Sequence, residues 1–172
     1  MSKKLDKNFY TKDVLEVAPL LIGKILVRKL DNGEIIKCRI TETEAYRGEE
    51  DSACHARFGL TKRTEVLYGD GGHTYVYLCY GIHYLLNVVT GKNGIPQAVL
   101  IRGIDGYDGP GKLTKFLDIT KQLNNIDLCN SDKLWIEDDG KKFNYTKTKR
   151  IGINYASEPY KSIEWRYVIK KD

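Results

Sequence analysis

Two glutamates, Glu42 and Glu44, end a segment that otherwise resembles an ordinary β-strand. Residues 34–46 run EIIKCRITETEAY, and alternate side chains of a strand point to opposite faces. The more apolar of these two faces carries Ile36, Cys38, Ile40, Glu42, Glu44 and Tyr46. Two carboxylates roughly 6–7 Å apart on one strand face would suit the paired acids of a carbohydrate hydrolase.

The strand pattern leaves two arrangements of these glutamates open. In the first, the apolar core gives way to a cleft and both carboxylates point into it. In the second, a β-bulge near Ile40 exchanges the two faces and sends both carboxylates to solvent.

An arginine stands among apolar residues further along the chain. In the segment AVLIRGI, strand alternation places Arg102 on the same face as Ala98, Leu100 and Ile104. An arginine on an apolar face usually has a carboxylate partner, and Glu44 is the candidate that we select.

Tyrosines gather around one predicted hairpin. Among the twelve tyrosines of the chain, Tyr75, Tyr77, Tyr80 and Tyr84 lie close together in the sequence. Packing across strands explains Tyr75 and Tyr84 well. Tyr80 precedes Gly81 at the hairpin tip, where a large ring is exposed and requires a partner. Proteins that bind nucleic acids stack bases on such rings or wedge side chains between base steps.

The sequence does not predict a metal or a nucleotide site. The histidines, His55, His73 and His83, lack ligand-like spacing to cysteines or acids. The segment GYDGPGKL resembles a phosphate-binding loop, but Leu113 stands where serine or threonine would meet magnesium, and a proline occupies the cradle. The helix start beside Lys112 remains a candidate contact for a DNA phosphate.

Composition places the chain among ordinary intracellular proteins. Its net charge of +5 and pI near 8.9 are compatible with a polyanionic partner. The basic run Lys147, Lys149 and Arg150 is typical of a solvated face. The four cysteines have no CxxC spacing, which indicates free thiols in a reducing compartment. Without a membrane span or signal core, we expect a cytoplasmic protein, near the nucleoid in a bacterium or nuclear in a eukaryote.

The predicted elements describe one domain covering residues 1–172. We expect a helix capped by Thr11 and ended by Gly23, a hairpin turning at Asn32-Gly33, and a second hairpin from HTYVYLCY and IHYLLNVV. Residues 97–104 form another strand, a helix starts at Pro110, and the tail supplies strands in DKLWIED, KRIGINYA and WRYVIK. The long segment 47–72 is functional or partly helical. The fold class is α/β mixed (α+β), with a curved, mostly antiparallel sheet and flanking helices.

Four segments in order carry a family resemblance: ITETEAYRGEEDSACH, YVYLCYGIHYLLNV, VLIRGI and RIGINYA. Together they resemble the alkyladenine (methylpurine) DNA glycosylase family. The resemblance implies a single mixed α/β domain that flips a damaged purine out of duplex DNA. It also implies hydrolysis of the N-glycosidic bond without a metal or cofactor.

The resemblance also implies roles for individual residues. Glu44 in ETEAY matches the general base that activates water, and Arg102 in LIRG matches the residue that helps to hold that water. The flipped base would lie among Tyr46, His55 and Tyr77, while Asn87 in LLNVV would crowd the exocyclic amine of normal guanine. Tyr80 would fill the gap that the flipped nucleotide leaves. No residue between Phe58 and Gly72 is matched.

We therefore expect a monofunctional purine DNA glycosylase that acts as a monomer on double-stranded DNA containing damaged purines. No lysine lies in the matched motifs, so base removal without strand cleavage is expected. One alternative is a catalytically silent nucleic-acid-binding module with the same basic face and tyrosines. The other is the carbohydrate hydrolase, which explains neither Tyr80 nor the basic charge.

Overall fold

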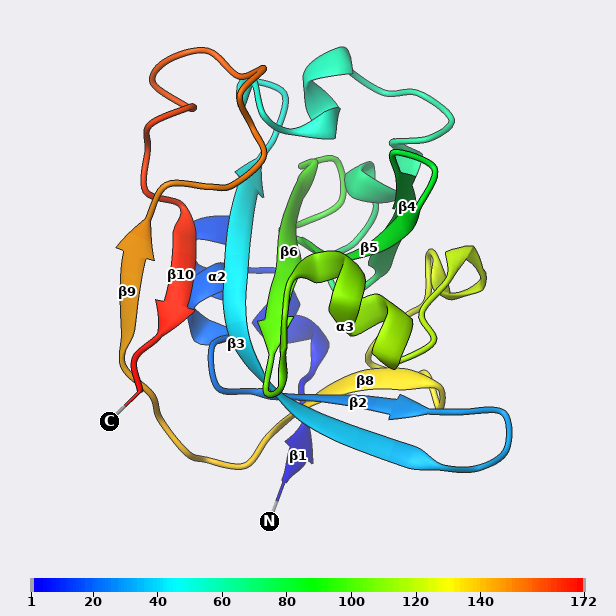
Figure 1. Cartoon of the computed structure of the whole chain (residues 1–172). Coiled ribbons are helices and arrows are strands. Elements are labelled where there is room, and N and C mark those ends of the chain that lie inside the picture. Colours follow the sequence, from blue (N-terminus) through cyan, green and yellow to red (C-terminus); the bar gives the residue numbers. More distant parts are fainter. Residues whose placement is uncertain (1, 172) are drawn as a thin grey trace.

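The computed structural model describes residues 2–171, which form a curved antiparallel sheet with short helices around it (Figure 1). The strand order along its main path is β1-β8-β2-β3-β6-β5-β4, and β10 joins at β3. The strands are β1 (Lys3–Lys4), β2 (Ile25–Lys29), β3 (Ile35–Arg47), β4 (Thr74–Cys79), β5 (His83–Thr90), β6 (Gln97–Ile104), β7 (Tyr107–Asp108), β8 (Leu134–Asp138), β9 (Tyr145–Thr148) and β10 (Arg166–Ile169). The predicted fold class is confirmed.

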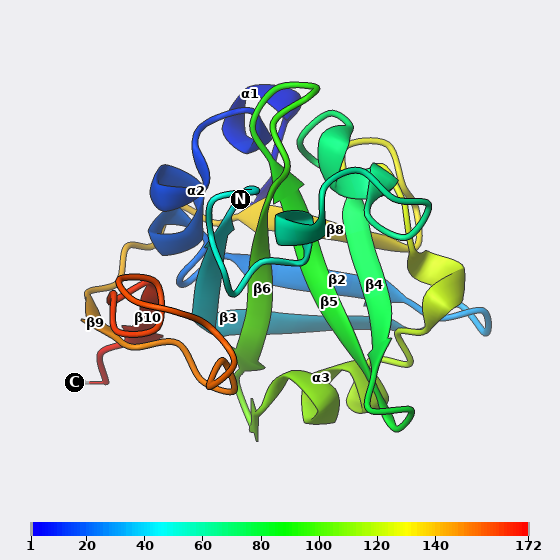
Figure 2. The ribbon, with the colours of Figure 1, turned by 90° about the horizontal axis from the view of Figure 1, so that it is seen from above.

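The helices lie on both sides of the sheet. They are α1 (Lys7–Tyr10), α2 (Val14–Leu20) and α3 (Pro110–Phe116), with the 3₁₀ turns η1 (His55–Phe58), η2 (Glu65–Tyr68) and η3 (Lys121–Leu123). In Figure 1, α2 lies behind β3 and β6, whereas α3 lies in front of them; the view from above in Figure 2 agrees. None of the helices in residues 2–171 is long and apolar enough to span a membrane.

The long strand β3 connects the two halves of the sheet. Its first half pairs with β2, and its second half pairs with β6 and β10. The register with β6 shifts on both sides of Glu42, so Thr41 and Arg102 have no direct partner across this pair. The predicted bulge near Ile40 therefore exists, but it does not send both glutamates to solvent, because Glu44 is completely buried.

The helix that the sequence predicts after Thr11 is α2, and it begins later than predicted. Thr11 ends α1 instead of capping α2, and the Asp13 side chain caps α2 by accepting from the amide of Leu15. Gln97 of β6 fixes this start, because its side chain accepts from the amide of Val14 and donates to Asp13. A contact between distant parts of the chain thus decides where the helix begins.

Two long connections, residues 48–73 between β3 and β4 and residues 149–165 between β9 and β10, shape the face above the sheet. The first connection contains η1 and η2, which confirms the partly helical alternative. The predicted strand in KRIGINYA is wrong: β9 ends at Thr148, and residues 149–157 form bends and turns. The prediction of a solvated face is also wrong for Arg150, whose side chain is fully buried, although Lys147 and Lys149 are exposed.

Candidate active site

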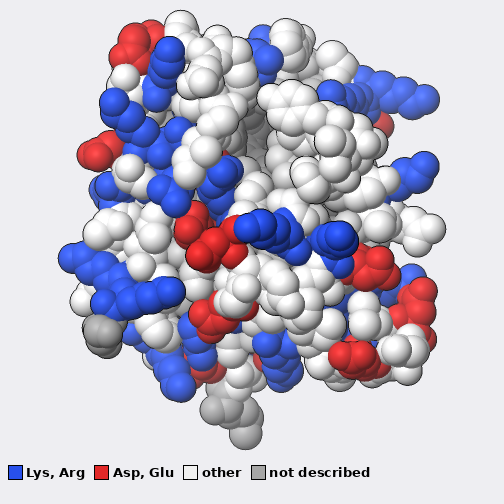
Figure 3. Space-filling model, viewed as in Figure 1, with Lys and Arg blue, Asp and Glu red and all other residues white. Residues whose placement is uncertain are grey.

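A cavity of about 670 Å³ opens between the two long connections, the β4–β5 hairpin and the start of α3. It appears in Figure 3 as a recess with Lys and Arg side chains on several sides. Every predicted site residue except Glu44 contributes to its wall. The wall includes Tyr46, Cys54, His55, Arg57, Arg63, Tyr75, Tyr77, Tyr80, Asn87, Leu100, Arg102, Lys112, Ile151 and Tyr155.

Glu44 lies directly behind this wall, with none of its side chain exposed. The Tyr46 hydroxyl donates to its Oε1 at 2.9 Å, and the backbone amide of Ile151 donates to its Oε2 at 2.7 Å. Arg102 Nη1 lies 3.7 Å from Oε1, which confirms the proximity predicted for this pair. These three partners fix the orientation of the carboxylate.

Burial sets the electrostatics of Glu44. Loss of hydration raises the pKa of its carboxyl above the ordinary value. The charge of Arg102 opposes this shift, and the hydrogen bonds from Ile151 and Tyr46 and the charge of Arg150 oppose it further. The site therefore holds a poorly hydrated carboxylate among donors, which is a suitable environment for a base.

Glu42 has different partners from Glu44. Its Oε2 accepts from Arg166 Nη2 at 2.7 Å, and it makes no hydrogen bond with the Tyr46, Ile151 or Arg102 groups that surround Glu44. Across β6, Glu42 pairs with Gly103 and Glu44 pairs with Leu100, so the two acids face different parts of that strand. The paired-acid hypothesis thus lacks its second carboxylate.

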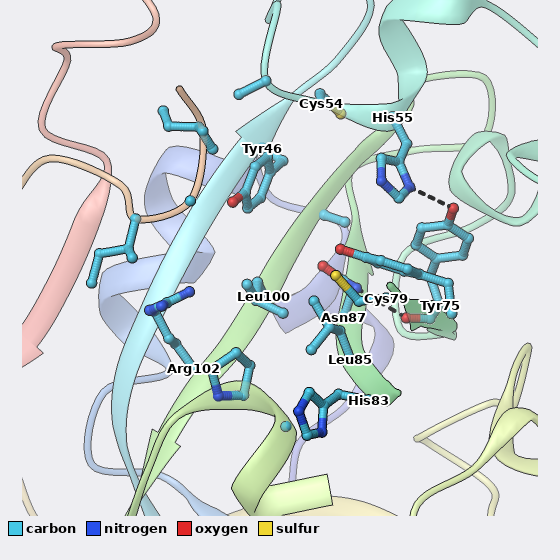
Figure 4. A pocket seen from close by; sticks show the side chains of 18 of the residues that line it. Tyr46, Cys54, His55, Tyr75, Cys79, His83, Leu85, Asn87, Leu100 and Arg102 are labelled. Atoms are coloured by element: carbon cyan, nitrogen blue, oxygen red, sulfur yellow. Dashed lines mark hydrogen bonds between the residues drawn. The ribbon is translucent and has the colours of Figure 1, made fainter. Parts of the chain in front are cut away.

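Aromatic rings form one end of the cavity (Figure 4). The His55 ring lies with its centroid 4.5 Å from that of Tyr77, and its Nδ1 is 2.8 Å from the Tyr75 hydroxyl. Burial, together with the charges of Arg63 and Arg57, lowers the pKa of His55 to about 4. A neutral imidazole near pH 7 fits a flat packing surface better than a proton donor.

Asn87 lies on β5 beneath these rings, and its side-chain amide donates to the backbone carbonyl of Tyr75 at 3.1 Å. It is almost fully buried. Its place on a central strand fixes a polar group on the cavity wall.

Tyr80 occupies the tip of the β4–β5 hairpin and is 90% exposed. Its φ of 53° and the φ of 67° at Gly81 form a turn closed by the amide of Ile82 donating to the carbonyl of Cys79 at 3.1 Å. A bulky residue rarely adopts positive φ, and such strain often marks a functional position. The neighbouring Leu78 and Ile82 are also exposed, so the tip presents an apolar surface beside the cavity.

The cavity wall is cationic. It carries Arg57, Arg63, Arg102 and Lys112, and no aspartate or glutamate within the described residues contributes to it. Arg63 lies in the unmatched segment, with its guanidinium 5.3 Å from the centre of the Tyr77 ring. Such a surface favours a negatively charged ligand, for example a nucleic-acid backbone.

One buried residue of the site was not predicted at all. Arg150 forms a bidentate pair with Asp51, and its guanidinium lies 4.9 Å from the centre of the Tyr46 ring. Its position after two lysines suggested an exposed side chain, and only the flanking isoleucine hinted at burial. Across residues 2–171, no three His, Cys, Asp or Glu side chains converge as a metal site would require.

Comparison with known proteins agrees with the fold. The family description "Methylpurine-DNA glycosylase" matches residues 8–108 and 105–172. A protein of Borrelia garinii subsp. bavariensis named "Putative 3-methyladenine DNA glycosylase" is 45% identical over 179 aligned positions, which cover 96% of each chain. Proteins of the same name from Methanocella arvoryzae and Rickettsia felis are 44% and 41% identical, covering 90% and 96% of this chain and 86% and 92% of theirs.

The fold and these relatives define a DNA glycosylase, an enzyme of base excision repair whose substrate is DNA. The chain belongs to the methylpurine-DNA glycosylase family, as its resemblance in sequence predicts.

Proposed function

We propose that this protein flips damaged purines out of duplex DNA and hydrolyses their N-glycosidic bond without cleaving the strand. The substrates are alkylated adenine and guanine, hypoxanthine and etheno adducts. The enzyme acts as a monomer through one glycosylase domain covering residues 1–172, and it uses no metal or cofactor. The observation that carries this proposal is the buried carboxylate of Glu44 behind an aromatic and cationic cavity.

Glu44 is the general base in this mechanism, and Arg102 helps to hold the attacking water. The water oxygen bonds to the sugar C1′ while its proton passes to the Glu44 carboxylate. The bond from C1′ to the base breaks, and its electron pair leaves with the base. An alkylated base already carries the positive charge that makes it a good leaving group, whereas hypoxanthine must first gain a proton.

The cavity supplies surfaces for an extruded base. Tyr46, His55 and Tyr77 provide the flat contacts, and Asn87 crowds the exocyclic amine of normal guanine. Tyr80 enters the duplex in place of the flipped nucleotide. The location of the first four residues on one cavity wall and of Tyr80 at its rim supports these roles.

The direct test is release of hypoxanthine from a synthetic duplex, detected as an abasic site that alkali converts to a strand break. Glu44→Gln should abolish release and leave affinity for the lesion duplex within a few-fold. Glu42→Gln is the matched control and should retain most activity, because its carboxylate pairs with Arg166 and not with the groups that surround Glu44. Equal losses at both positions would favour paired acids, and binding without release by the wild type would favour a non-catalytic module.

The absence of lyase activity needs its own test, because Lys112 lies on the cavity wall. A lyase forms an imine between an amine and the opened sugar, and borohydride reduces that imine to a stable cross-link. We expect no cross-link to lesion DNA. A trapped complex that disappears in Lys112→Arg would show that the enzyme is bifunctional.

A further inference from the structure

Arg150 and Asp51 form a completely buried ion pair beside the candidate active site. Arg150 Nη1 lies 2.7 Å from Asp51 Oδ2, and Nη2 lies 2.9 Å from Oδ1. The guanidinium also donates to the backbone carbonyls of Ala45 at 2.9 Å and Tyr160 at 3.0 Å. The arginine thereby binds the backbone carbonyl of Ala45, the residue after Glu44, and the carboxylate of Asp51 in the connection that follows β3.

The pair joins the two long connections that border the cavity. Asp51 accepts from the backbone amides of Arg47 and Ala53, so it organises the turn that leads to His55. On the other connection, Arg150 directly precedes Ile151, whose amide binds Glu44. Any displacement of Arg150 therefore moves a hydrogen-bond donor of the proposed base.

Stability alone does not account for such a pair. Desolvation of two charges largely cancels their attraction, and well-packed apolar residues often replace a buried ion pair without loss of stability. The guanidinium instead lies over the Tyr46 ring, whose hydroxyl binds Glu44. Both of its effects, through the ring and through the Ile151 amide, converge on one carboxylate.

Charged and polar groups from β3, β6, β10 and the connection after β9 surround Glu44. Arg102 on β6 lies 3.7 Å away, and the Tyr46 hydroxyl is hydrogen-bonded to it. Arg166 on β10 stands opposite Glu44 in register, but its guanidinium pairs with Glu42. Arg150 is paired with Asp51, so each member of this buried ion pair screens the charge of the other.

We propose, on the basis of the proposed function, that Arg150 and Asp51 are positioning residues that set the charge state of Glu44 as the catalytic base. The pair holds the Ile151 amide and the Tyr46 ring against the carboxylate, and the charge of Asp51 offsets part of the field that Arg150 exerts on Glu44. Removing one charge leaves the other uncompensated next to the base. The two single variants therefore disturb Glu44 in opposite directions.

The test is the pH profile of single-turnover hypoxanthine excision by the full chain. In Arg150→Gln the uncompensated Asp51 disfavours the Glu44 carboxylate, so the acid limb of the profile should move up by about one pH unit. In Asp51→Asn the uncompensated arginine favours the carboxylate, so the limb should move down by a similar amount. The double variant restores charge balance and should return the limb close to its wild-type position.

Two further variants keep the test decisive. Lys149→Gln removes an exposed charge one residue away and should not move the limb. Arg150→Lys keeps the charge but loses the bidentate geometry, so the limb should stay while the plateau rate falls several-fold. Thermal melting of each variant identifies any that fail to fold.

A merely structural pair would behave differently. Folded single variants whose acid limbs stay in place, or move in the same direction, would overturn this inference alone. A wild-type protein that releases no base at any pH would overturn the proposed function, and this inference with it.

Discussion

Replacing Tyr80 by asparagine should separate stability from function at the hairpin tip. The ring is 90% exposed, so its removal uncovers little apolar surface. A buried tyrosine covers roughly 200 Å², and a tenth of that at about 25 cal/mol per Å² is about 0.5 kcal/mol. Residue 80 has a φ of 53°, which asparagine adopts more readily than tyrosine does. The substitution should therefore regain a similar amount of stability through the backbone. The free energy of unfolding should therefore stay within about 1 kcal/mol of the wild type.

The same substitution should have a larger effect on DNA. If Tyr80 fills the gap of the flipped nucleotide, its loss leaves an unstacked step that costs a few kcal/mol. A deficit of about 2 kcal/mol corresponds to roughly 30-fold weaker binding of lesion duplex. Binding to undamaged DNA should change little, because the ring enters the duplex only on flipping.

Urea denaturation measures the first quantity, and titration of lesion and undamaged duplexes measures the second. Fluorescence of 2-aminopurine next to the lesion reports flipping directly. Tyr84→Asn is the matched control. Because Tyr84 packs against the main core, this variant should lose about 2 kcal/mol of stability. Equal 2-aminopurine signals from Tyr80→Asn and wild type would refute the wedge role, and a large stability loss would refute the strain argument.

Five further outcomes are expected. Excision of alkylated adenine should rise with pH as Glu44 loses its proton and then level off, whereas hypoxanthine should give a bell because it needs a proton to leave; single-turnover rates for both substrates check this. The His55 ring should stay neutral until the pH falls to about 4, since burial lowers its pKa, and NMR titration of the ring measures it. EDTA should leave turnover unchanged, and added salt should weaken DNA binding steeply in a titration at several salt concentrations. Arg63→Gln should raise excision of 7-methylguanine relative to hypoxanthine several-fold, because a cation near the Tyr77 ring repels a cationic base; an unchanged ratio would contradict this.

Local signals were sufficient for most of the sheet and for part of the site. The pair Asn32-Gly33 predicts a hairpin because glycine readily adopts the positive φ that such turns need, and Gly33 has a φ of 91°. Alternation of apolar residues predicts β4, β5 and β6 correctly, because alternate side chains of a strand point to opposite faces of the sheet. The exposure of Tyr80 followed from its place beside Gly81, without any knowledge of tertiary structure.

Contacts between distant residues account for what the sequence did not show. Asp13 caps α2 in place of Thr11 because Gln97, 84 positions away, binds Asp13. Arg150 is buried because Asp51, 99 positions away, neutralises it. No local pattern contains either partner, so a helix start and a buried arginine were both misplaced.

The bulge in β3 shows how a small irregularity decides which acid belongs to the site. An unbroken ladder that continues from the Glu44–Leu100 and Thr43–Ile101 pairs would place Glu42 opposite Arg102. The register shift places Gly103 opposite Glu42 instead, and a Cβ at that position would lie 2.9 Å from Thr41 Oγ1 and 3.2 Å from Glu42 Cβ. Because glycine permits this close approach, Arg102 is free to lie beside Glu44, while Glu42 pairs with Arg166. Neither arrangement that the strand pattern allowed holds for both glutamates: the strand does bulge, but Glu44 is buried behind the cavity and Glu42 pairs with Arg166.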